Sequence, residues 1–130
     1  MKLEINSNEY EIIIVEQNDE RLLIDDYIHT GKIDYIKQEI YIQNGLKPHV
    51  LRYTLIHELT HAVINSYGLM QIEWNDEIVA DFIANNTCLI GDLYNEILEK
   101  LISGELKYDQ TGNWNTKRNN VRTIKIWNSN

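Results

Sequence analysis

Short apolar runs separated by turn residues fill the first third of the chain, a pattern typical of a small β-sheet. Residues 9–15 are rich in β-branched side chains and follow the turn-like segment 6–8. We therefore expect a buried strand there, able to form a hairpin with residues 3–5. The run 21–27 fits a helical turn or a strand, because it is too short for its periodicity to decide.

A second set of strands is expected between two turns. Gly31 marks the first turn, and the Asn44-Gly45 pair marks the second. Between them, apolar positions within 33–35 and 40–42 indicate two more strands. A small sheet is therefore expected ahead of any helix.

Apolar positions take up helical spacing after Pro48, whose missing N–H costs nothing in a first helical turn. We expect this helix over residues 48–67, with Gly68 as the residue that stops it. Its apolar side chains are Leu51, Leu55, Ile56, Leu59, Ala62 and Val63.

A second, longer helix is expected to begin at a cap formed by Asn75 or Asp76 and to end near Gly104. Gly91 is a point at which this helix can bend or divide. Cys88 is expected to be a buried, inert thiol within it, the alternative being a redox or ligand role. The helix carries a broad apolar stripe that comprises Ile78, Val79, Phe82, Ile83, Leu89, Ile90, Leu93, Tyr94, Ile97, Leu98 and Leu101.

The last part of the chain differs in composition. From residue 107 onward it holds five basic residues, one acid and many asparagines. We expect a loop over 112–120 and a final strand within 121–127. The chain is thus divided into a domain over 1–104 and a basic, Asn-rich extension over 105–130 that packs on the same domain.

Length and composition exclude several classes of function. A chain of 130 residues with 43% apolar and 25% charged residues suits one globular domain with a modest core. The formal net charge of −8 argues against nucleic acid as a partner, because phosphate contacts need clustered cations. The longest purely apolar run, residues 12–15, is too short to cross a membrane, and the N-terminal residues lack a secretory-signal pattern, so we expect a cytoplasmic protein.

The chemistry of the chain centres on the first predicted helix, where His57-Glu58-Leu59-Thr60-His61 matches the HExxH pattern. Residues four apart lie on one helix face, so both imidazoles can bind one zinc ion. Glu58 lies beside that ion as the candidate general base, able to take a proton from the attacking water. The alternative is that His57 and His61 are ordinary helix-face histidines, but burying them with a carboxylate in an apolar helix is costly without a partner.

A catalytic zinc usually has three protein ligands and one water, so a third ligand is needed. The start of the second helix offers Glu77 and Asp81, which are four residues apart and share a face. We expect Glu77 to bind the ion and Asp81 to orient a ligating imidazole from the second coordination sphere. The alternative is that both acids only stabilise the positive end of the helix dipole. Glu73 and Asp76 are further candidates for the third ligand. His29 and His49 are expected at the surface.

These motifs resemble a known family. Thr54-Leu-Ile-His-Glu-Leu-Thr-His-Ala62, followed by Glu77 and Asp81 on a second helix, is similar to the gluzincin arrangement of zinc metallopeptidases. The likeness is closer to the small ImmA/IrrE-type peptidases of phages and mobile elements, and it covers roughly residues 31–102. It implies an α+β fold: a minimal zincin-like domain whose small, mostly antiparallel sheet packs on the HExxH helix and a second long helix.

The sequence therefore predicts a zinc-dependent metallopeptidase that hydrolyses peptide bonds in a protein or peptide substrate, with Glu58 as general base. The alternative is a catalytically inactive zincin-like module of a phage or mobile element that binds a protein partner. Glu58 separates the two predictions, because a purely structural zinc site has no use for a base.

Overall fold

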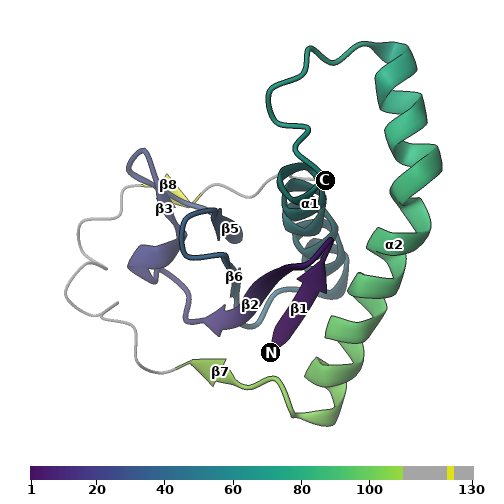
Figure 1. Cartoon of the computed structure of the whole chain (residues 1–130). Helices are drawn as coiled ribbons and strands as arrows, with labels where there is room; N and C mark the ends of the chain where they lie inside the picture. Colours follow the sequence, from purple (N-terminus) through teal and green to yellow (C-terminus); the bar gives the residue numbers. More distant parts are fainter. Residues whose placement is uncertain (110–122, 125–130) are drawn as a thin grey trace.

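A five-stranded sheet and two long helices make up most of the computed structural model, which describes residues 1–109 and 123–124 (Figure 1). The predicted α+β class, with a small sheet packed on two helices, is confirmed. The strands pair within two antiparallel hairpins, β1 with β2 and β5 with β6, and β2 joins the hairpins by parallel pairing with β6. The strands of this sheet are β1 (Lys2–Ile5), β2 (Asn8–Val15), β5 (Gly31–Asp34), β6 (Glu39–Gln43) and β7 (Tyr108–Asp109).

The ambiguous run 21–27 forms a turn and part of a second, smaller sheet. A 3-10 turn, η1 (Glu20–Leu22), is capped by Asp19, whose side chain accepts a hydrogen bond from the Arg21 amide. β3 (Leu23–Ile24) then pairs antiparallel with β4 (Tyr27–Ile28). From the C-terminal extension, β7 pairs with β2, and β8 (Thr123–Ile124) pairs with β4, both in parallel. The loop predicted over 112–120 and the rest of the strand predicted within 121–127 lie outside the described residues.

Both predicted helices are present close to the expected bounds. α1 (Pro48–Ser66) begins with proline in its first turn, and the next glycine, Gly68, has the positive φ of 70° that ends such helices. α2 (Asp76–Ser103) is capped by Asn75, whose side chain accepts from the Ile78 amide at 3.0 Å. It runs through Gly91 as a single helix, so that glycine does not divide it.

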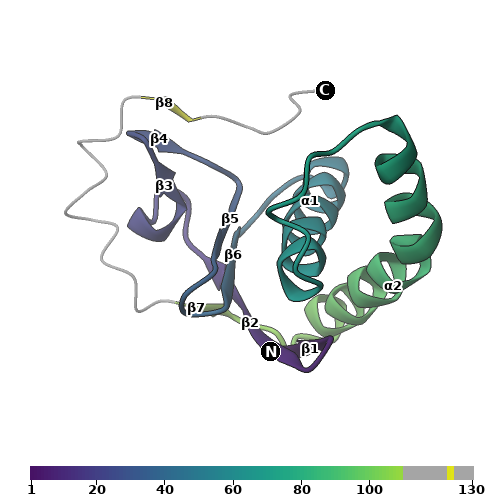
Figure 2. The ribbon, with the colours of Figure 1, turned by 45° about the horizontal axis from the view of Figure 1, so that its top comes forward.

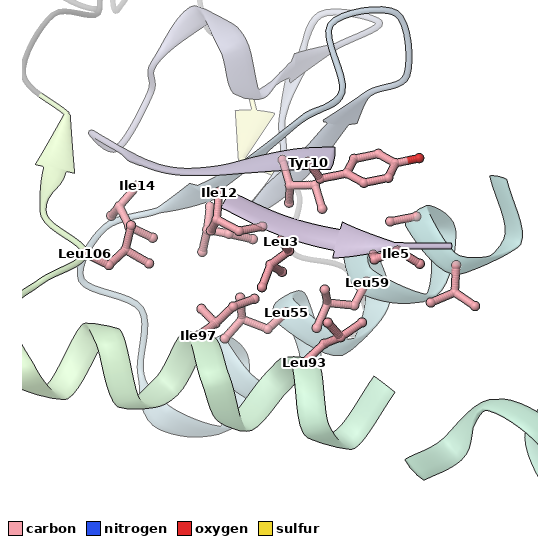
Figure 3. Packing of buried hydrophobic residues seen from close by; sticks show 14 residues of the cluster. Leu3, Ile5, Tyr10, Ile12, Ile14, Leu55, Leu59, Leu93, Ile97 and Leu106 are labelled. Carbon is pink, nitrogen blue, oxygen red and sulfur yellow. The ribbon is translucent and has the colours of Figure 1, made fainter. Parts of the chain in front are cut away.

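The hydrophobic core lies between the sheet and the two helices, as Figure 3 shows. One face of the β1–β2 hairpin contributes side chains that alternate along the strands, as a half-buried sheet requires. Both helices contact these strands through the apolar side of each helix. The core residues labelled in the figure are Leu3, Ile5, Tyr10, Ile12, Ile14, Leu55, Leu59, Leu93, Ile97 and Leu106.

Only the second half of α2 takes part fully in this core. Its buried residues are Leu93 and Ile97, and its first half, up to Ile90, has no buried side chain. Figure 1 shows these first turns extending past α1 and the sheet. Cys88 is exposed, so the prediction of a buried thiol was wrong. The apolar pattern continues to the N-terminus of α2, but α1 and the sheet end before they reach it.

Candidate functional site

The HExxH motif lies on α1 with its two imidazoles on one face. Nε2 of His57 and Nε2 of His61 are 3.2 Å apart, and both rings are half-buried. Two nitrogens bound to one tetrahedral zinc at about 2.0–2.1 Å would be about 3.3 Å apart. Tyr53 stacks on His57 at a centroid distance of 5.6 Å. The two nitrogens thus converge at the separation that a shared cation needs.

Burial favours the neutral form of both imidazoles. It lowers the pKa of His57, with smaller contributions from the positive charges of His61 and His29, and it also lowers the pKa of His61. A neutral imidazole has the free nitrogen lone pair that a metal ligand requires. The two rings are therefore held in the protonation state that binds a cation.

Glu58 points to the sheet side of α1 and is almost completely buried, with 3% of its surface exposed. Loss of solvation raises its pKa from 4.5 to about 7. A carboxyl group with a pKa near neutrality can both accept and release a proton at physiological pH. The structure thus gives the residue after His57 the acid–base property expected of a general base.

Glycine at position 31 makes room for Glu58. Gly31 is the first residue of β5, where the sequence pattern had predicted a turn. A Cβ atom on this residue would lie 2.6 Å from Cγ2 of Thr54 and 3.0 Å from Cγ of Glu58. The hydroxyls of Thr30 and Thr54 are hydrogen-bonded at 2.8 Å and hold this part of the chain against α1. The close approach of β5 to α1 therefore depends on the absence of a side chain at Gly31.

The fold adds two residues to the surroundings of the motif that the sequence did not indicate. His29, expected at the surface, is 4% exposed, and its charge contributes to lowering the pKa of His57. Tyr35 follows β5, and its own pKa is raised first by burial and then by the charges of Glu58 and Tyr10. Their local sequence contains no signal for this role, because both reach the motif only through the path of β5 along α1. His49 is exposed as predicted.

The two acids predicted to complete the metal site lie elsewhere in this structure. Glu77 and Asp81 are both exposed, on the first turns of α2. Glu77 precedes the buried Leu93 by 16 residues, and Asp81 precedes the buried Ile97 by 16 residues. A separation of 16 residues places two side chains about 160° apart around a helix. They therefore lie on the side of α2 that faces away from the core. Within residues 1–109 and 123–124, no three His, Cys, Asp or Glu side chains are grouped so that they could hold a metal ion.

Comparison with known proteins identifies no family for this chain. A scan against protein-family models finds no match, and searches of curated proteins and of solved structures find no similar protein. In the described part of the chain, no helix combines the length and the apolar character needed to cross a bilayer. The function of the chain is therefore inferred from the residues and geometry of the site.

Proposed function

We propose that the chain is a zinc-dependent metallopeptidase of the zincin type, with His57 and His61 as metal ligands and Glu58 as general base. The observation that carries this proposal is the 3.2 Å separation of the two Nε2 atoms. A buried carboxyl group whose pKa is about 7 lies one residue from the first of these ligands. Two convergent neutral imidazoles beside such an acid–base group match the needs of metal-assisted hydrolysis.

Two kinds of group take part in the reaction: the imidazoles that hold the metal and the carboxyl group that transfers protons. Zinc held by the two imidazoles would supply a Lewis acid that polarises the scissile carbonyl and lowers the pKa of a water. Glu58 takes the proton from the attacking water and passes it to the nitrogen of the leaving amine. Burial of Glu58 between β5 and α1 fixes the position of its carboxyl group and keeps bulk water from solvating it.

We propose an extended peptide segment of a protein as the substrate. β5 stands at the end of the strand order β1-β2-β6-β5, so within the described residues no strand of this sheet pairs with its outer edge. An extended peptide can add to such an edge through main-chain hydrogen bonds. β5 also packs on α1 at Gly31, which would bring a peptide on this edge close to the HExxH helix.

Glu77 stays the proposed third ligand, with Asp81 as the partner that orients an imidazole. Both acids lie on the first two turns of α2, residues 76–81, where no side chain is buried. The metal affinity of Glu77 variants tests this proposal without reference to catalysis.

The location and biological context are proposed on other grounds. The single cysteine cannot form a disulfide within the chain, which is compatible with the reducing cytoplasm. The resemblance to ImmA/IrrE-type peptidases suggests a regulator of a phage or mobile element that acts by cleaving another protein.

Hydrolysis of a fluorescence-quenched peptide library by the zinc-loaded protein tests the function. We expect Glu58→Gln to keep zinc and lose at least a hundredfold in rate, because only the base is removed. His57→Ala and His61→Ala should lose zinc, whereas the exposed His49→Ala should not. Zinc binding without hydrolysis in the unmodified protein would instead support the protein-binding module. Equal hydrolysis by the Glu58→Gln protein would contradict the assigned base.

A further inference from the structure

The apolar stripe of α2 is covered at one end of the helix and open at the other. Val79 and Ile83 lie on the same face of α2 as Leu93 and Ile97, because apolar residues that recur every three or four positions lie on one side of a helix. Leu93 and Ile97 are 6% and 0% exposed, whereas Val79 and Ile83 are 42% and 56% exposed. The same stripe thus holds buried core residues in the second half of the helix and the exposed Val79 and Ile83 in the first half.

Exposed apolar side chains also occur in the loop before α2. Nine large apolar side chains are exposed in the described residues, and five of them fall within residues 67–83. Figure 1 shows that the loop after α1 leads directly to the first turns of α2, and Figure 2 shows the same end of the molecule from another direction. We name these five residues the α2 face; they are Tyr67, Met70, Ile72, Val79 and Ile83.

The charge around the α2 face selects the kind of partner. Residues 67–83, which include the α2 face, contain Glu73, Asp76, Glu77 and Asp81 and no Lys or Arg. Glu73 and Asp76 lie in the sequence between the loop residues and the helix residues of the α2 face, and both are exposed. A second copy docking by the same face would bring these acids against one another, which like-charge repulsion opposes. A segment that carries apolar residues on one side and cations beside them would satisfy both the apolar surface and its acidic edge.

We propose that the α2 face is a docking site for an amphipathic, cationic helix of a partner protein. The apolar side of that helix would cover Val79 and Ile83 and continue the core that ends at Leu93. Its Lys or Arg residues would lie next to Glu73 and Asp76. None of the residues of the α2 face belongs to the HExxH motif, so binding of the helix is measured without added zinc.

Fluorescence anisotropy with a designed peptide tests this site on the full chain without added zinc. The probe is a fluorescein-labelled helix of about four turns, with Leu on one face and Lys on the others. Its partner probe has Glu in place of every Lys. We expect the Leu/Lys peptide to bind at least tenfold more tightly than the Leu/Glu peptide, and added salt to weaken that binding.

Variants locate the binding on the α2 face. We expect Val79→Ser with Ile83→Ser to weaken binding at least tenfold, while the melting temperature stays unchanged because both side chains are already exposed. Ile36→Ser with Ile102→Ser is the matched control, since these residues are 97% and 79% exposed outside the α2 face and should leave binding unchanged.

Charge reversal tests the choice of a cationic partner. Glu73→Lys with Asp76→Lys should weaken binding of the Leu/Lys peptide and strengthen that of the Leu/Glu peptide. Glu4→Lys with Glu99→Lys makes the same charge change at exposed sites elsewhere and should do neither. The proposal is overturned if the Leu/Lys peptide does not bind, if both peptides bind equally, or if both apolar variants weaken binding alike. It is also overturned if sedimentation shows a dimer that Val79→Ser with Ile83→Ser dissociates, since the occupant would then be a second copy.

Discussion

Replacing Gly31 with alanine tests how tightly β5 is packed on the HExxH helix. The new Cβ would lie 2.6 Å from Cγ2 of Thr54, whereas carbon atoms in contact are about 3.5–4.0 Å apart. Thr54 cannot rotate away freely, because its side chain is 1% exposed and its hydroxyl is bonded to Thr30. The second neighbour is Cγ of Glu58 at 3.0 Å, so relief of the clash would also displace the proposed base.

The expected loss of stability follows from two opposing effects. An extra methyl group in a packed site costs about 1–3 kcal/mol. Replacing glycine also reduces the entropy of the unfolded chain, which returns about 0.4–1 kcal/mol where the backbone tolerates alanine. We therefore expect Gly31→Ala to lower the free energy of unfolding by about 2 kcal/mol. In a Thr54→Ser background the clashing methyl is gone, and the loss should fall below about 1 kcal/mol.

Urea unfolding of the four proteins in this double-mutant cycle measures both quantities. Gly91→Ala is the matched control, because a Cβ at that helical glycine meets nothing within 4 Å and should stabilise the protein by about 0.5–1 kcal/mol. Tight packing at Gly31 is disproved if Gly31→Ala is as stable as the parent protein, or if its loss of stability is the same with serine and with threonine at position 54.

Three further predictions concern the site and its support. In metal-free protein, the native state keeps the Glu58 proton between pH 4.5 and about 7 while the unfolded chain releases it. As the pH rises through that range, the free energy of unfolding should therefore fall by about 3 kcal/mol relative to that of Glu58→Gln. Parallel pH profiles of the two proteins would contradict the raised pKa. Glu77→Ala should weaken zinc binding at least tenfold in a competition titration, with Asp76→Ala as the control; equal effects would show that Glu77 is not a ligand. Tyr10→Phe should cost about 1–2 kcal/mol in thermal unfolding, since the buried Tyr10 hydroxyl accepts a hydrogen bond from Asn65 at 2.7 Å; an unchanged melting temperature would disprove this role.

Local signals accounted for most of the elements. The hairpin of β1 and β2 and the bounds of α1 and α2 follow from β-branched runs, proline, an asparagine cap and glycine stops, each of which acts over a few residues. The convergence of His57 and His61 is equally local, because a spacing of four on a helix places two side chains on one face. Their HExxH pairing could therefore be predicted from the pentapeptide alone.

Contacts between distant segments decided the rest. Burial of Glu58 depends on Gly31, which lies 27 residues away in the chain and was predicted only to mark a turn. The position of His29 beside the motif has the same origin, since β5 carries the preceding segment past α1.

The helices, the first hairpin and the pair of imidazoles could be predicted from the sequence, because backbone propensity and helical periodicity act between near neighbours. The sequence did not determine which part of an apolar stripe is covered. Val79 and Leu93 belong to one continuous pattern on α2, yet Val79 is 42% exposed and Leu93 is buried, because core side chains of the strands and α1 pack against Leu93. Burial depends on what packs against a residue, which only the folded chain determines. The tertiary structure therefore set the surroundings of Glu58, the exposure of Glu77 and the exposure of the α2 face.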